Sequence, residues 1–235
     1  MSSRLLLICL TLTLTTSALL TTARANPKLP PLLVPPAPAG YLLVDEDMWS
    51  QLMDEAGRHL DRARDAFVHG HHRTTALEFH KAAIMMKIDA AHGKDRADSA
   101  LLTSAHELDH LAQRILNGKS TDTIDDIDAA SSRALTALAA HEQTKAVQAW
   151  KQDQPRRSGR YLRAAADNLE RAAFRARVAM NTATADAIRN SRVLSTKLID
   201  NTGYAIDEVG KGMDAMGHQV ERLGQAIMHP LTEKR

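Results

Sequence analysis

Apolar residues recur at every third and fourth position from about Val44 to the C-terminus. No segment sustains the alternation of period two that a half-buried strand requires. Alanine, the residue with the highest helix propensity, is abundant, whereas aromatic residues make up 3% of the chain. The sequence therefore predicts an all-α protein, a helical bundle of five or six helices.

Glycines, prolines and capping residues divide this pattern into separate helices. Gly70 and Gly118 suit helix ends, and Pro155 suits the first turn of a helix. We expect helices over about 45–68, 74–91, 94–117 and 120–150, and from Pro155 to about 176. Beyond Met180, apolar residues keep helical spacing as far as Ile227, which predicts a long terminal helix or a helix pair.

Four glycines fall seven residues apart in this terminal segment: Gly203, Gly210, Gly217 and Gly224. A glycine in a helix interior costs about 1 kcal/mol relative to alanine. Their regular spacing favours close approach by another helix, from the same chain or from a second subunit, over a frayed glycine-rich tail.

The N-terminus reads as an export signal. Arg4 precedes an apolar run from Leu5 to Leu20, and small residues surround a cleavage site after Ala25. Six prolines lie between Asn26 and Gly40 and favour an extended tether. The expected organisation is a signal peptide over 1–25, a proline-rich linker over 26–43, a helical bundle over 44–180 and a C-terminal helical segment over 181–228. We expect a periplasmic or secreted protein with no transmembrane segment after cleavage.

The charge and the cysteine content of the chain argue against a nucleic-acid partner and against cysteine chemistry. The chain has 30 basic and 28 acidic residues, and loss of Arg4 and Arg24 with the signal leaves the two signs equal. A mature chain without excess positive charge lacks the electrostatic footprint of a nucleic-acid partner. Cys9, the single cysteine, lies in the signal, so we expect no disulfide, thiol nucleophile or cysteine-bound metal.

Two segments carry a family resemblance: 63–83, which reads ARDAF followed by Gly70, Ala76 and KAA, and a looser copy around His141, Trp150 and 160–173. The pattern resembles uncharacterised exported bacterial helical proteins and, more distantly, the YfdX family of periplasmic proteins. The resemblance covers about Met48 to Ala173. It implies an envelope helical bundle connected with stress tolerance, and it carries over no functional residue. The two segments also share an offset that pairs His59 with His141, consistent with either a duplicated hairpin or chance similarity.

His106-Glu107-Leu108-Asp109-His110 matches the HExxH pattern, in which two histidines bind zinc and the glutamate activates water. Leu108 lies on the expected core stripe, so both histidines point about 160° away from it, toward solvent. No third-ligand motif and no substrate-binding strand accompany them. A zinc peptidase is therefore a remote alternative, which predicts chelator-sensitive peptide hydrolysis.

A non-catalytic metal site is the closer alternative. Histidines one turn apart chelate Zn²⁺, Ni²⁺ or Cu²⁺ on an exposed helix, as His106 and His110 are placed to do. His69, His71 and His72 cluster around Gly70. Solvated polar side chains are the alternative explanation of both groups, and this alternative is favoured over a metal site.

His141 shares a face with Ala134 and Leu138 and should point into the bundle. It is either a hydrogen-bonded structural residue or a pH sensor whose protonation loosens packing. Since no catalytic or cofactor motif fits its structural context, we expect a non-enzymatic structural, binding or stress-related protein. A homo-oligomer or a protein partner is expected to use the C-terminal helix.

Overall fold

The computed structural model describes residues 54–91, 96–118 and 122–228. These residues form seven α-helices and no strand, so the all-α prediction is confirmed. The helices are α2 (Glu55–Val68), α3 (His72–Ala90), α4 (Arg96–Leu116), α5 (Ile124–Lys151), α6 (Pro155–Arg175), α7 (Thr182–Asp200) and α8 (Ile206–Met228). The expected signal over 1–25, the linker over 26–43 and the first turns of the helix expected from residue 45 lie outside the described residues.

The count of seven helices corrects the expected five or six. The terminal segment divides into α7 and α8 because Asn201 ends α7 in the left-handed conformation, with φ of 55°. Gly203, with φ of 59°, lies in the same turn. Two residues in this conformation end a helix.

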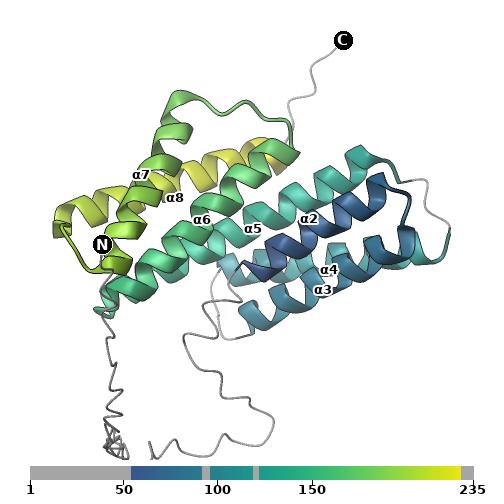
Figure 1. The fold of residues 1–235 in the computed structure, drawn as a ribbon, viewed down its shortest axis with the longest axis horizontal. Coiled ribbons are helices and arrows are strands. Elements are labelled where there is room, and N and C mark those ends of the chain that lie inside the picture. The colour runs from purple at the N-terminus through teal and green to yellow at the C-terminus, as the bar shows by residue number, and fades with distance from the viewer. Residues whose placement is uncertain (1–53, 92–95, 119–121, 229–235) are drawn as a thin grey trace, which may run out of the picture. The chain divides into compact units, whose positions relative to one another are not determined.

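Helix α5 is the centre of the fold. It is 28 residues long and packs against α2, α4, α6 and α8. α2 and α4 pack on one part of α5, with α3 packed against both of them, and α6 and α8 pack on another part, with α7 packed against both of these (Figure 1). The N-terminus of α5 carries a capping box, in which Thr123 and Asp126 each accept a hydrogen bond from the other's backbone N–H. Hydrogen bonds from Thr123 lower the pKa of the Asp126 carboxyl.

The core combines many alanines with a few large side chains. Small side chains let helices approach closely, and the largest fully buried residues fill the remaining space. Among these large residues are Phe79, Leu60, Met86, Leu108, Leu138, Leu162 and Leu198. Gly159 marks a close approach of α6 to the backbone of α7, because a Cβ built there would lie 2.7 Å from the carbonyl oxygen of Ser195 on α7.

The four regularly spaced glycines of the terminal segment have different roles. Gly203 lies in the turn before α8, and a Cβ at Gly210 would meet nothing within 4 Å. Gly217 and Gly224 do face another helix, since Cβ atoms there would lie 3.6 Å from Gln143 and 3.1 Å from Thr136 on α5. Close approach therefore involves two of the four glycines, and the neighbouring helix belongs to the same chain.

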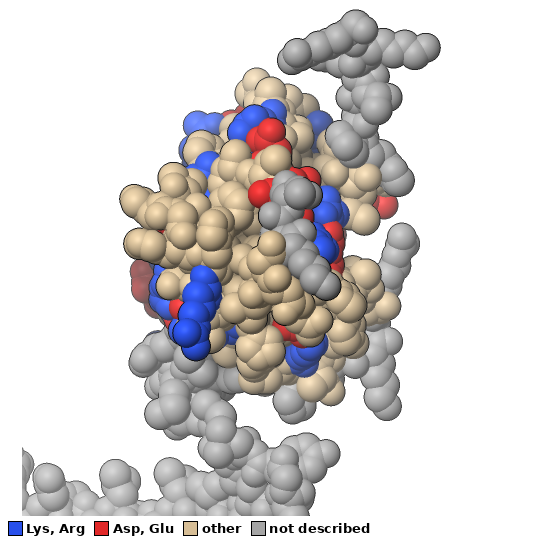
Figure 2. Space-filling view, turned by 90° about the vertical axis from the view of Figure 1, so that its right-hand side faces the viewer, with Lys and Arg blue, Asp and Glu red and all other residues tan. Residues whose placement is uncertain are grey.

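Basic and acidic side chains lie intermingled on the face shown in Figure 2, and large areas of it carry neither. Within the described helices, none combines the length and apolar character that crossing a membrane demands.

Candidate functional site

The histidines of the HExxH segment lie on the outer face of α4. His106 and His110 are exposed, whereas Leu108 between them is fully buried. Glu107 forms a two-pronged ion pair with Arg133 of α5, whose Nε donates to Glu107 Oε2 at 3.1 Å. This pair occupies the carboxylate that a zinc peptidase uses as its general base.

His69, His71 and His72 are all exposed at the α2–α3 turn. The rings of His69 and His71 stack with centroids 6.2 Å apart, and His72 meets the edge of Phe67. His69 Nδ1–H donates to the Asp65 carbonyl oxygen at 2.7 Å, which leaves Nε2 for a ligand. Across the described ranges, no three His, Cys, Asp or Glu side chains come together in a metal-binding group. The five histidines named as metal ligands stay a prediction.

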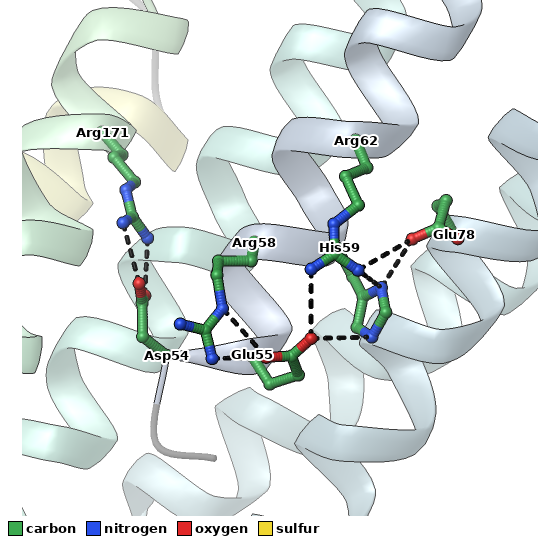
Figure 3. Close-up of polar contacts among 7 residues, drawn as sticks. All are labelled: Asp54, Glu55, Arg58, His59, Arg62, Glu78 and Arg171. Carbon is green, nitrogen blue, oxygen red and sulfur yellow. Dashed lines mark hydrogen bonds and ion pairs between the residues drawn. The ribbon is translucent and has the colours of Figure 1, made fainter. Parts of the chain in front are cut away.

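The first buried histidine joins α2 to α3. His59 Nδ1–H donates to Glu78 Oε2 at 2.6 Å, and its Nε2 lies 3.6 Å from Glu55 (Figure 3). Burial raises the pKa of Glu78, but hydrogen bonds from Lys81 and His59 outweigh it and leave that pKa below its usual value. His59 and Lys81 therefore stabilise the charged form of the mostly buried Glu78 carboxylate. The sequence pattern did not identify Glu78 as a partner of His59.

The second buried histidine joins α5 to α4. His141 and Asp98 are each 3% exposed, and His141 Nδ1 lies 2.8 Å from Asp98 Oδ1. His141 points into the bundle, as its position on the helix predicts. His59 and His141 occupy corresponding positions relative to the two similar segments. Both bond a buried carboxylate through Nδ1. Their partners come from different neighbours, α3 and α4, so the likeness does not extend to the partner.

Ion pairs between distant parts of the sequence connect α2 to α5 and α6. Arg171 donates two hydrogen bonds to Asp54, at 2.6 and 2.9 Å (Figure 3). Arg64 binds both oxygens of Asp128, at 2.7 and 3.2 Å. Arg175, 8% exposed, bonds Asp61 and lies 3.5 Å from Asp128. These contacts join the three helices to one another.

A groove of about 780 Å³ lies where α4, α5 and α8 meet. Its lining comes from one stripe on each helix, at spacings of three and four residues. The stripes are Ala97, Ala100, Thr103, Ser104 and Glu107 on α4, Arg133, Thr136, Ala137, Ala140, Gln143 and Thr144 on α5, and Gly217, Val220, Glu221, Gly224, Gln225 and Met228 on α8. Gln143 Nε2–H donates to the Met213 carbonyl oxygen at 2.7 Å and fastens α8 to α5 beside the groove.

Comparison of the chain with protein-family models, with curated proteins and with solved structures finds no match. The resemblance to the YfdX family therefore depends only on the sequence of segment 63–83 and on the residues around His141, Trp150 and 160–173. The geometry of the site is the basis for a functional proposal.

Proposed function

We propose that this protein is an exported, non-enzymatic binding protein of the cell envelope or exterior. Its groove between α4, α5 and α8 receives an amphipathic α-helix of a protein partner. The observation that carries the proposal is this groove, because a binding module built on the terminal helix requires an apolar recess beside that helix.

The shape of the groove favours a helix as its occupant. Each of the three lining stripes extends over about eleven residues, which corresponds to roughly 16 Å along a helix. The stripes repeat at helical spacing, so they present ridges and grooves of the kind into which another helix packs. A fourth helix laid along them completes a four-helix arrangement in which α5 forms the floor.

The chemistry of the lining favours a partner helix with small and medium apolar residues on one face. Ala97, Ala100, Ala137 and Ala140 leave room for a partner's side chains, and Val220 provides apolar contact. The Glu107–Arg133 pair already satisfies its own charges, whereas Glu221 is exposed at the rim. A basic residue at the edge of the partner's apolar face therefore complements the groove.

A synthetic helical peptide tests this function. The probe has about 14 residues, with leucine and alanine along one face and lysine on the other. We expect it to bind the full chain, and we expect Ala100→Trp, which places a large ring in the groove, to weaken binding by about tenfold, or 1.4 kcal/mol. Fluorescence anisotropy of the labelled peptide measures both dissociation constants.

The matched control is Ala215→Trp, because Ala215 is an exposed alanine of α8 that does not line the groove. It should bind the peptide as the unmodified protein does. The proposal is contradicted if the two tryptophan variants weaken peptide binding equally. It is also contradicted if the unmodified protein does not bind the peptide. A concentration-dependent dimer that Ala100→Trp abolishes assigns the groove to a second copy of the chain instead.

Metal binding through histidine is the second candidate, favoured by the exposure of His106 and His110 one turn apart on α4. If they chelate Zn²⁺, Ni²⁺ or Cu²⁺, calorimetry at about pH 7.5 should give stoichiometric binding that His106→Ala/His110→Ala removes. Binding should weaken as the pH falls toward about 6, because protonated imidazole does not ligate metal. A titration without binding at pH 7.5 rejects this candidate.

A further inference from the structure

Glu142 on α5 is a buried residue with one carboxylate oxygen that has no hydrogen-bonding partner. The residue is 2% exposed, and its Oε2 atom accepts no hydrogen bond. Within the described part of the chain, no Lys, Arg or His nitrogen forms an ion pair with it within 4.0 Å. The two buried histidines, His59 and His141, bond other carboxylates, those of Glu78 and Asp98.

The charged groups around Glu142 offer little compensation. Asp89 on α3 and Asp54 before α2 are the like charges that act on it, and Lys145, one turn along α5, is the favourable one. Tyr161 faces it from α6. Asp98 of α4 is hydrogen-bonded to His141. Arg171 of α6 donates two hydrogen bonds to Asp54, which offset the charge of that carboxylate.

An ionised carboxylate in this position is costly, because burial removes its water without providing donors. Burial, followed by the charges of Asp89 and Asp54, raises the pKa of Glu142 well above its usual value. Burial also raises the pKa of Asp89 to about 7, against the opposing effect of Lys145. Both carboxyl groups therefore bind protons more readily in the folded chain than in the unfolded one.

We propose that Glu142 is a proton-uptake site that stabilises the helical bundle as the surroundings become acidic. Protonation neutralises its buried carboxylate and gives it an O–H donor, and the nearby charge of Asp89 strengthens the effect. Acidification is therefore expected to stabilise the fold. A histidine switch at His141 would have the opposite effect, because its protonation loosens packing. This proposal does not depend on what the groove binds.

The pH range follows from the direction of the shifts. A carboxyl whose pKa is raised on folding contributes stability that is complete below its unfolded value and is lost as the pH rises through its folded value. For Asp89 this range extends from 3.8 to about 7. Folding lowers the pKa values of three other carboxyl groups, those of Glu55, Glu78 and Asp109. The stability that these groups contribute is lost as the pH falls below their unfolded pKa values of 4.5, 4.5 and 3.8. Stability should accordingly rise between about pH 8 and pH 5 and fall in stronger acid.

Thermal unfolding of the full chain at pH 8.0 and pH 5.5 tests the proposal. We expect the Tm of the unmodified protein to be about 5 °C or more higher at pH 5.5. Glu142→Gln, which keeps the shape and removes the charge, should raise the Tm at pH 8.0 and remove most of the difference between the two conditions. Asp89→Asn should remove part of the same difference.

The control is Asp214→Asn, because Asp214 is exposed on α8 and does not line the groove, and it should reproduce the behaviour of the unmodified protein. A Tm that stays constant or falls on acidification, or a Glu142→Gln variant that keeps the full rise, overturns the proposal. If Glu142→Gln does not unfold cooperatively, carboxyl ¹³C titration of the unmodified protein decides. A Glu142 signal that titrates well above its unfolded value of 4.5 supports the site, and one that titrates at or below that value overturns it.

Discussion

Replacing Asp128 by alanine is expected to lower the free energy of unfolding by about 3 kcal/mol. Asp128, 5% exposed on α5, binds Arg64 through both oxygens and lies 3.5 Å from the buried Arg175. Its removal leaves Arg175 with Asp61 as its remaining ion-pair partner. A buried cation that loses a counter-charge is costly because water does not reach it. Urea unfolding followed by circular dichroism measures the loss.

Asp125→Ala is the matched control, because Asp125 lies on the same helix and forms an exposed ion pair with Arg177. Such surface pairs contribute about 0–1 kcal/mol. If the two variants lose similar amounts of stability, the buried ion pairs joining α2, α5 and α6 stabilise the fold no more than an exposed pair does.

Replacing Gly159 by valine should have an effect of similar size, about 3 kcal/mol. A Cβ at this position would lie 2.7 Å from the Ser195 carbonyl oxygen and 2.8 Å from the Leu198 Cβ. Both atoms belong to α7, so the side chain forces α7 away from α6 and opens the buried contact around Leu198, which is fully buried. The midpoint of urea unfolding should fall, and a loss of protection in α7 should accompany it in hydrogen exchange.

Gly210→Val provides the control for this substitution. Gly210 is also a glycine within a helix, but a Cβ there would meet nothing within 4 Å. Valine at this position should leave stability within about 0.5 kcal/mol of the starting protein or raise it slightly, because glycine is the weaker helix former. A loss equal to that of Gly159→Val contradicts a specific close approach at Gly159.

Local sequence signals predicted the helices well because they depend on neighbouring residues. The apolar stripes and the Pro155 start gave the fold class and placed α6 within a residue or two of its observed range. The same reasoning underestimated the number of helices, because the turn at Asn201 and Gly203 interrupts an otherwise continuous apolar pattern. It also gave one role to four glycines, two of which face α5.

The polar contacts of the interior were not predictable in this way. Asp54 and Arg171 are separated by 117 positions, and no local pattern connects two such residues. Glu142 lies beside His141 in an alanine-rich stretch, and helical periodicity alone does not distinguish a buried glutamate from one at the edge of the core. The α4–α5–α8 groove likewise depends on how three helices pack, although the terminal helix was expected to carry the binding surface.

Amide hydrogen exchange of the full chain, measured with and without the helical peptide, shows whether the α4–α5–α8 groove binds a helix. We expect the peptide to slow exchange along the groove-lining parts of α4, α5 and α8, around Ala100, Ala140 and Val220. At the same peptide concentration, Ala100→Trp should reduce this protection. Protection around the exposed Phe174 and Met180 at the α6–α7 turn, with the groove unchanged, would contradict the assignment of the α4–α5–α8 groove as the binding site.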